Sequence, residues 1–204
     1  NVSFQRDYLI KIGIMPENII NWTNENYKIE ELIVPSLPFF YYGKSYLTKY
    51  EIYSYESLNW FRKIMLEKYA PKLNKDNKRI MITRGSSKKR YIKNISQIKI
   101  LLKKYNFVFL DLDNYSENEI ISLFYNAEII MAIHGAALSN IIYSKNSKII
   151  EIFPKNMEDQ GLNVLYQLSM FFNLEHHILV SDNLYKNGSF NVDPKKLENI
   201  IKFL

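Results

Sequence analysis

The sequence predicts a parallel, doubly wound α/β sheet over its last two thirds. Short apolar runs rich in β-branched residues alternate there with segments whose apolar residues recur at helical spacing. Residues that favour helix N-termini stand ahead of several of these segments. Because helices separate the successive strands, we expect the strands to run parallel, with helices on both faces of the sheet.

Five runs fit the strands of such a sheet. The first, 79–83 (RIMIT), is apolar and bounded by polar residues, which is typical of a buried strand. The other four expected strands are 107–112, 128–133, 147–153 and 176–180.

The helices between these strands are predicted from their N-caps and their apolar spacing. Asn94, with Gln97 three residues later, precedes one helix, and Ser116 with Glu119 forms a capping box ahead of the next. Asp193, followed by a Pro, fits the N-cap of a last helix. A further helix carries the apolar residues Leu162, Leu165, Leu168 and Phe172.

The first seventy residues follow a less regular pattern. Helices are expected around 5–13 and over 55–69, and strands at 18–22 (NIINW) and 30–35 (EELIVP). The aromatic stretch 36–50 shows no clear period. This pattern is typical of the tail of a second α/β domain.

A polar stretch at 72–78 marks the expected domain boundary. We therefore divide the chain into a partial N-terminal α/β segment, 1–75, and a C-terminal domain, 76–204.

The composition is that of a globular chain with a positive charge. The 204 residues include 27 Lys and Arg against 21 Asp and Glu, a net charge of +6 that favours anionic partners. These cations are scattered, so binding of nucleic acid would depend on one short basic cluster at 87–94. The chain has no Cys, which excludes disulfides and thiolate metal sites.

Polar residues follow or end three of the predicted strands. Arg84 directly follows the first strand, and His134 with Gly135 follows the third. Glu151 lies within the fourth strand, near its end. Ligands of doubly wound sheets bind outside the carboxyl ends of the strands. These residues converge on one ligand only if their strands are neighbours.

The segment after Arg84 has two interpretations. A Gly, two Ser and a run of cations up to Arg90 precede a helix start, where they would cradle a diphosphate. The alternative is a solvated basic loop, and the segment lacks the Walker pattern of a P-loop.

The segment IHGAALSN also has two interpretations. Gly135 and Ala136 would let a ligand approach the backbone at a helix start. His134 would then donate to a phosphate or sugar oxygen, and Asn140 would reach back to brace the loop. Alternatively, His134 is a structural residue satisfied by a neighbouring carbonyl.

Two other groups of ionisable residues do not favour a metal site or a phosphatase. His176 and His177 are adjacent on a strand, so their side chains diverge. Asp111 and Asp113 mimic the paired aspartates of haloacid-dehalogenase-type phosphatases, but Tyr115 stands where those enzymes carry Thr. Both carboxylates would face one side of a strand, and we expect at most one of them to touch a ligand.

Taken in order, these segments resemble glycosyltransferase family 61, which is linked to capsular polysaccharide biosynthesis and includes the EGF-domain-specific O-GlcNAc transferase. The resemblance runs from 30–38 (EELIVPSLP) through 79–94 (RIMITRGSSKKRYIKN) to 114–154. Its most specific part is the last. There AEIIMAIHGA is followed by Asn140, five residues after Gly135, and then by IIEIFP. The stretch SENE lacks the Glu-Gln pair common at this helix, and Ala137 replaces the usual Gly.

This resemblance implies a GT-B architecture, with two facing Rossmann-like domains and the donor nucleotide held mainly by the C-terminal one. It implies inverting transfer from a nucleotide sugar, UDP-linked in our expectation, to a hydroxyl of a glycan or protein. No obligatory metal and no further cofactor are implied. The chain would supply the donor domain and part of the acceptor domain. The residues expected to bind the donor are Arg84, Arg90, Asn94, His134, Gly135, Ala136, Asn140 and Glu151.

The expected roles follow from the chemistry of the leaving diphosphate. Its negative charge needs preorganised donors, which Arg84, Arg90 and the N–H groups after Gly135 would supply. His134 then belongs to the phosphate pocket and is not expected to be the general base, which stays unassigned. Glu151 would hold ribose hydroxyls or cap the end of its strand.

Two other functions stay open on the sequence alone. One is a non-catalytic GT-B-like binding domain, and the other is a basic α/β module that binds nucleic acid, although we expect no nucleic-acid partner. Bacterial relatives act in the cytoplasm on surface polysaccharide, whereas eukaryotic ones work in the lumen of the ER and Golgi. The absence of Cys favours the cytoplasm. A peripheral contact with a membrane also stays open.

Overall fold

A five-stranded, fully parallel sheet forms the centre of the molecule. The computed structural model describes residues 3–20, 28–31, 39–42, 50–72, 78–83, 90–155 and 162–204. The strand order is β5-β3-β6-β7-β8. The strands are β3 (Arg79–Thr83), β5 (Phe107–Asp111), β6 (Ile129–Ile133), β7 (Lys148–Pro154) and β8 (Glu175–Ser181). The five predicted strands and their parallel arrangement are confirmed.

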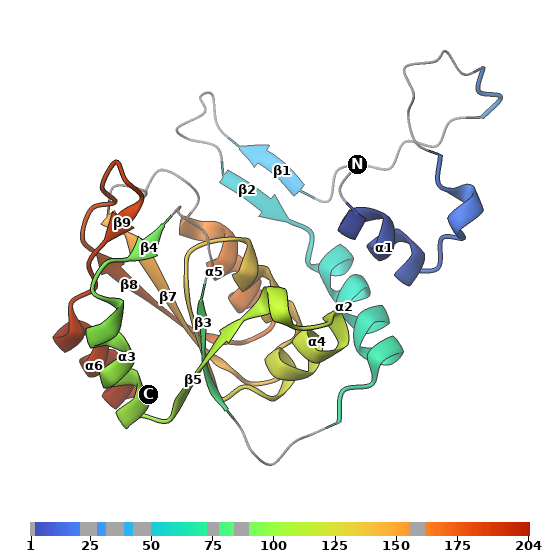
Figure 1. The fold of residues 1–204 in the computed structure, drawn as a ribbon. Coiled ribbons are helices and arrows are strands. Elements are labelled where there is room, and N and C mark those ends of the chain that lie inside the picture. The colour runs from blue at the N-terminus through green and yellow to red at the C-terminus, as the bar shows by residue number, and fades with distance from the viewer. Residues whose placement is uncertain are drawn as a thin grey trace.

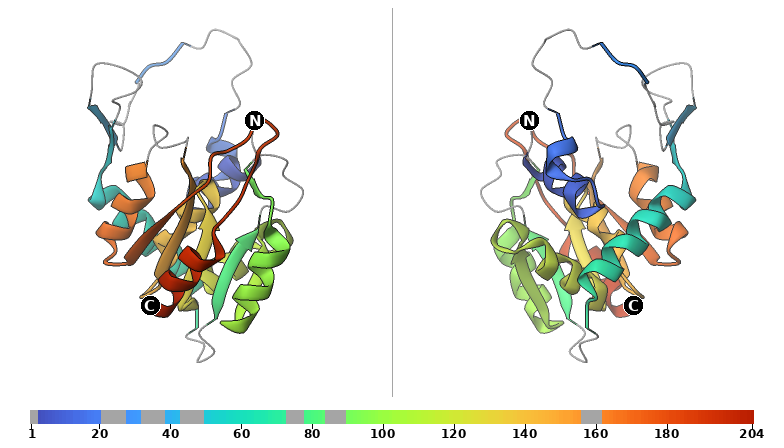
Figure 2. Two further views of the ribbon diagram at one scale, coloured as in Figure 1. Left: turned by 90° about the vertical axis from the view of Figure 1, so that its left-hand side faces the viewer. Right: turned by 90° about the vertical axis from the view of Figure 1, so that its right-hand side faces the viewer.

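Helices cover both faces of this sheet (Figures 1 and 2). One face carries α3 (Ile95–Lys104) and α6 (Pro194–Phe203). The other carries α2 (Tyr55–Tyr69), α4 (Glu117–Asn126), the 3₁₀ helix η4 (Ala136–Tyr143) and α5 (Leu162–Phe171). Within the described residues, no helix combines the length and the apolar character needed to cross a membrane.

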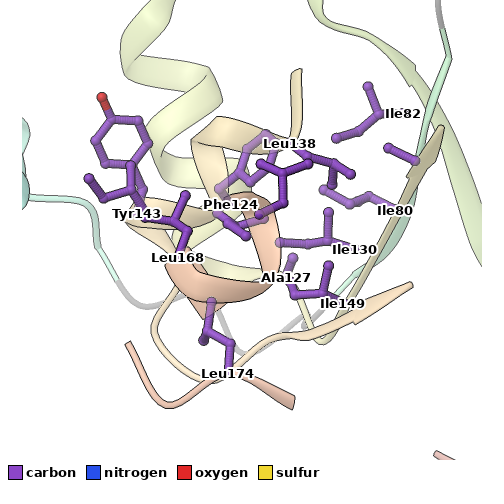
Figure 3. Packing of buried hydrophobic residues seen from close by; sticks show 14 of the residues in the cluster. Ile80, Ile82, Phe124, Ala127, Ile130, Leu138, Tyr143, Ile149, Leu168 and Leu174 are labelled. Atoms are coloured by element: carbon purple, nitrogen blue, oxygen red, sulfur yellow. The ribbon is translucent and has the colours of Figure 1, made fainter. Parts of the chain in front are cut away.

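Alternation of side chains along the strands builds two apolar cores, one on each face of the sheet. Ile130 and Ile149 pack with Phe124 and Leu168 on the face of α4 and α5 (Figure 3). Met131, next to Ile130 in the strand, packs on the face of α3 and α6. All residues of β6 are buried, as expected for a strand covered on both faces.

Several smaller elements surround this sheet. The N-terminal part contains α1 (Ser3–Lys11), the 3₁₀ helix η1 (Pro16–Asn18) and an antiparallel pair, β1 (Phe39–Tyr42) and β2 (Tyr50–Tyr53). A short parallel pair joins β4 (Tyr91–Ile92) to β9 (Ser189–Phe190), and the 3₁₀ helix η3 (Leu112–Asn114) follows β5.

The prediction of strands at 18–22 and 30–35 is wrong for those of their residues that the structure describes. Asn18 ends η1, and residues 19–20 and 30–31 belong to no strand, while the rest of both runs lies outside the described residues. Strands β1 and β2 instead overlap the aromatic stretch that showed no period. Four residues in each strand offer too few positions for an alternating pattern to stand out.

Helix α2 has the predicted bounds and packs on the main sheet. Met65 is fully buried and belongs to the same apolar cluster as Ile80 and Ile130. Arg62 donates from Nη2 to the carbonyl of Ser144 at 2.7 Å. The division of the chain near residue 75 stays a prediction, and α2 contributes to the core on the C-terminal side of that boundary.

The predicted capping residues have two outcomes. Ser116 and Glu119 form the capping box of α4, and Asp193 caps α6. Asn94 occupies the N-cap position of α3, but its side chain makes no capping bond. Its amide instead donates to the carbonyl of Val192 at 2.8 Å and accepts from the N–H of Val192 at 3.0 Å. An Asn amide has both a donor and an acceptor, so it can close this pair of bonds in place of the local cap.

We expect Ser116→Ala to lower the free energy of unfolding by about 1 kcal/mol, because it removes the hydroxyl that accepts from the Glu119 N–H at the start of α4. Urea denaturation measures this change. Ser57→Ala is the matched control, because Ser57 lies on the exposed side of α2. Its effect should stay below about 0.5 kcal/mol. Equal losses in the two variants would contradict the capping role.

Candidate functional site

The carboxyl ends of β3, β6 and β7 lie side by side. The strands that carry or precede the predicted site residues are therefore neighbours, as a shared ligand site requires. From β3 the chain crosses to β5 by way of α3, whereas from β6 it continues to β7 by way of η4 on the opposite face. The connections therefore leave β3 and β6 in opposite directions. Such a switch point opens a crevice beyond the strand ends, where doubly wound folds bind their ligands.

His134 and Gly135 form the turn that follows β6. The N–H of His134 donates to the carbonyl of Ile152 at 2.9 Å, which extends the pairing with β7. Gly135 has φ 156° and ψ 178°, a conformation that is essentially restricted to glycine. The short helix expected after this turn is the 3₁₀ helix η4.

Arg90 reaches the same turn from the segment ahead of β4. Its backbone is left-handed, with φ 57°, and its Nη1 donates to the carbonyl of His134 at 3.0 Å. Four of the predicted donor-binding residues share one cavity of about 370 Å³. Among the described residues, its lining includes Arg90, His134, Gly135, Ala136, Ser139, Val164 and Leu165.

The first turn of η4 adds backbone donors at this cavity. Leu138 donates to the carbonyl of Gly135 at 3.0 Å, but the N–H groups of Ala136 and Ala137 find no acceptor among the described residues. The first N–H groups of a helix have no partner within the helix, and they attract anions. The guanidinium of Arg90 adds a permanent positive charge. The cavity therefore suits an anionic ligand with several oxygen acceptors.

Behind His134, a chain of buried polar side chains runs across β7 to β8 and α5. His134 Nδ1 and His176 Nε2 each bond one oxygen of Glu151, the latter at 3.0 Å. On its other side, His176 Nδ1 bonds Ser169 Oγ at 2.7 Å. Glu151 and Ser169 are fully buried, and the side chain of His176 is 1% exposed against 13% for His134. The His134 end of this chain reaches the cavity.

Glu151 is ionised at neutral pH in this setting. Burial by itself raises the pKa of the carboxyl group, but the hydrogen bonds from His134 and His176 outweigh it and hold the pKa of Glu151 below its ordinary value. Both oxygens have partners and the residue has no exposed surface, so Glu151 does not line the cavity. In place of the ribose contact or strand-end cap considered from the sequence, it lies behind His134.

Three other predicted donor-binding residues lie away from the lining of this cavity or outside the described chain. The amide of Asn94 is occupied by the backbone of Val192. Asn140 Nδ2 donates to the carbonyl of Ala137 at 3.0 Å, one turn back within η4. Arg84 lies outside the described residues. Their roles in donor binding stay predictions.

The sequence did not point to His176 or Ser169 as site residues. His176 and His177 do diverge, since His177 bonds Glu175 and lies 5.9 Å, ring to ring, from Phe203 of α6. The sequence contains one indication that such residues exist, which is Glu151 within the apolar run IIEIF. A carboxylate in a buried strand needs hydrogen-bond donors beside it. Which residues supply them depends on the pairing of β7 with β8.

A larger and mainly apolar cavity, of about 680 Å³, adjoins the first one. The two cavities share Ser139, Val164 and Leu165, and the larger one extends to Tyr8 and Phe61. Burying an unpaired charge among apolar side chains is costly. Charged groups of a ligand are therefore confined to the Arg90 end of this combined space.

Asp111 and Asp113 do not form a pair of carboxylates on one strand face. Asp111 ends β5 and accepts from the N–H of Asp113 at 3.3 Å, whereas Asp113 lies in η3. The expectation of a shared strand face is wrong, because the chain leaves the strand between the two residues.

We expect Glu151→Gln to change the acid stability of the protein. The folded-state pKa of Glu151 lies below its ordinary value of 4.5. Its ionised form therefore contributes stability that is present above about pH 4.5 and is lost as the pH falls through the folded-state pKa. The variant should have a free energy of unfolding lower by about 1–3 kcal/mol at pH 7, and a shallower decline from about pH 5 to 3. Urea titrations across this range measure both quantities.

Glu175→Gln is the matched control for this experiment. Glu175 also accepts from a histidine, His177 at 2.8 Å, but its side chain is 45% exposed, so solvent screens the pair. Its replacement should change the stability at pH 7 by less than about 0.5 kcal/mol. Equal losses in the two variants would contradict the distinct role of the buried carboxylate.

Comparison with known proteins agrees with the resemblance read from the sequence. Glycosyltransferase 61 is the family that matches, over residues 4–150, which is well over half of the chain and includes the His134 turn. Glu151, Ser169 and His176 lie beyond the matched residues. No protein of curated function matches the chain at a significant level. The extent of the family match shows that the chain belongs to glycosyltransferase family 61.

Proposed function

We propose that the chain transfers a sugar from a nucleoside diphosphate sugar, in the first place a UDP-linked one, to a hydroxyl group of a glycan or protein. Family membership supports sugar transfer in general. The observation that carries the finer proposal is the grouping of Arg90, His134 and Ala136 around one cavity, with an Ala136 N–H that finds no acceptor in the part of the chain that the structure describes. Guanidinium and helix N–H groups are the donors that phosphate oxygens prefer.

In this proposal the cavity stabilises the leaving diphosphate. Negative charge builds on its oxygens as the bond to the sugar breaks. Arg90 and the N–H groups of Ala136 and Ala137 are in place beforehand, so they act without reorganising. His134 adds a donor at Nε2 when its ring is protonated on both nitrogens, because Nδ1 is held by Glu151. These donors would supply the charge stabilisation of a metal-independent reaction, and the predicted residue Arg84 would add a second guanidinium.

Inverting transfer would require a hydroxyl that attacks from the side opposite the diphosphate, through a transition state with oxocarbenium character. A general base must take the hydroxyl proton. The Arg90 cavity offers cationic groups and N–H donors, so we place the base on the acceptor side of the cleft. This arrangement corresponds to a GT-B architecture, with 76–204 as the donor domain. We retain surface polysaccharide biosynthesis as the expected pathway and the cytoplasm as the expected compartment.

We expect Arg90→Asn to weaken the binding of UDP by about 10- to 100-fold, the loss that corresponds to one charge-assisted hydrogen bond. Asn tolerates the left-handed backbone found at this position, so the variant removes the guanidinium without imposing backbone strain. Titration calorimetry of the folded chain with UDP and UDP-sugars measures the affinity.

Lys93→Asn is the matched control, because it removes the same charge from an exposed residue three positions away that does not line the cavity. Its effect on UDP affinity should be less than about threefold. Equal effects would show that UDP senses only net charge, and a folded wild type that does not bind UDP would contradict the donor site. Binding without sugar transfer or donor hydrolysis in the intact protein would favour a non-catalytic binding domain.

A further inference from the structure

We propose that His176 is a positioning residue for the diphosphate site. With Ser169 it fixes the proton arrangement around Glu151, so that His134 is the ring that gains a proton on Nε2 when an anion binds in the cavity. The inference rests on the proposed function, because it assigns the anion as the diphosphate of the donor. It makes donor binding a proton-coupled event.

The hydrogen bonds of Glu151 fix one proton on each of the two histidine rings that face it. Its two oxygens meet one imidazole nitrogen each, from His134 and His176, and the residue has no exposed surface. A buried, ionised carboxylate requires donors at both oxygens. His134 must therefore carry a proton on Nδ1 and His176 a proton on Nε2. This leaves His134 Nε2 and His176 Nδ1 as the two positions where one further proton could reside.

The other ring nitrogen of His176, Nδ1, also has a partner. Its Nδ1 lies 2.7 Å from Ser169 Oγ, and a serine hydroxyl can donate to a bare ring nitrogen. Neutral His176 is then fully satisfied: it donates from Nε2 and accepts at Nδ1. The ring is 1% exposed, so a positive charge on it would lack access to solvent or to a ligand. The geometry favours His176 as a neutral donor with one fixed tautomer.

The exposure of His134 makes its Nε2, and not His176 Nδ1, the position for the one further proton. This ring is 13% exposed and lines the cavity, and it packs against Phe153 with ring centroids 4.5 Å apart. With Nδ1 held by Glu151, Nε2 is the ring nitrogen left for a ligand. A protonated ring would donate from Nε2 to an anionic oxygen, whereas a neutral ring would present a lone pair to it.

The charged and titratable groups around this pair act in opposite directions. Glu151 favours a proton on His134, whereas the guanidinium of Arg90, bonded to the His134 carbonyl, opposes it. His176 also donates a hydrogen bond to the carboxylate of Glu151, which reduces the effect of that carboxylate on His134. The ring of Tyr166 lies 5.7 Å from that of His176. A bound diphosphate offsets the positive charges of Arg90 and His134 together. Its binding should therefore draw a proton onto Nε2.

The protonation pattern can be read in the free chain, without any donor. The sequence has three His, so ¹⁵N-histidine labelling and long-range ¹H–¹⁵N spectra resolve every ring, with assignment by single His→Gln variants. We expect His176 to carry its proton on Nε2, with Nδ1 bare, and His134 to carry a proton on Nδ1. A bare Nδ1 on His134, or a proton on Nδ1 of His176, would overturn the inference.

The coupling to the donor is measured as affinity against pH. The probe is UDP-glucose or UDP-N-acetylglucosamine rather than UDP, because a terminal phosphate itself titrates near pH 6. Uptake of one proton makes the affinity fall by up to about tenfold per pH unit once His134 loses its Nε2 proton. His134→Gln should bind more weakly and without this dependence between pH 6 and 8.

His176 itself is tested with three variants. His176→Leu removes one donor from Glu151, so the carboxylate acts more strongly on His134. The fall in affinity should then begin at a higher pH. His176→Gln keeps an amide donor in reach and should restore the wild-type profile. His177→Leu, one residue along on the opposite face, should leave the profile unchanged.

These outcomes separate the inference from the proposed function. A shift with His176→Leu that His176→Gln reverses would support the positioning role, whereas a purely structural role would lower stability and leave the pH profile in place. UDP-sugar binding without pH dependence would overturn the inference alone. Absence of UDP-sugar binding by the folded wild type would overturn both.

Discussion

The pairing of β6 with β3 on one side and β7 on the other is the constraint on which the site depends. Every residue of β6 is buried, so the strand fits only at the centre of a sheet that is covered on both faces. Parallel pairing then brings the carboxyl ends of three strands to one edge. The His134 turn and the carboxylate of Glu151 in β7 become neighbours because their strands pair.

Glu151 is the one charged residue among the buried polar residues that the structure describes. A carboxylate without partners at this depth would cost several kcal/mol. The cost is offset because its two oxygens receive two imidazole donors, and the second imidazole is itself completed by Ser169. Such a network is favourable only when all its members are satisfied. Its one less buried end, His134, is also the end that reaches the cavity.

The ligand-facing part of the site contains two residues with positive φ. Gly135 adopts a conformation open essentially to glycine, and Arg90 has a left-handed backbone. The guanidinium of Arg90 donates to the carbonyl of His134, and the N–H groups of Ala136 and Ala137 find no acceptor among the residues that the structure describes. The adjoining apolar cavity restricts charged ligand groups to this end. Membership of glycosyltransferase family 61 supports sugar transfer in general, and the diphosphate of a sugar donor is the anion that we propose for this cavity.

The sequence by itself determined the strands of the main sheet, the caps of α4 and α6, and the family, because these depend on local periodicity, side-chain capping chemistry and an ordered motif. It also indicated that His134 and Gly135 lie at a strand end. It did not determine the partners of Glu151, the Asn94 bonds to Val192, or the Arg90 contact with His134. Each of these joins residues 17 to 98 positions apart. Only the order and register of the strands decide which such residues meet, because local patterns define the face of a strand but not its neighbour.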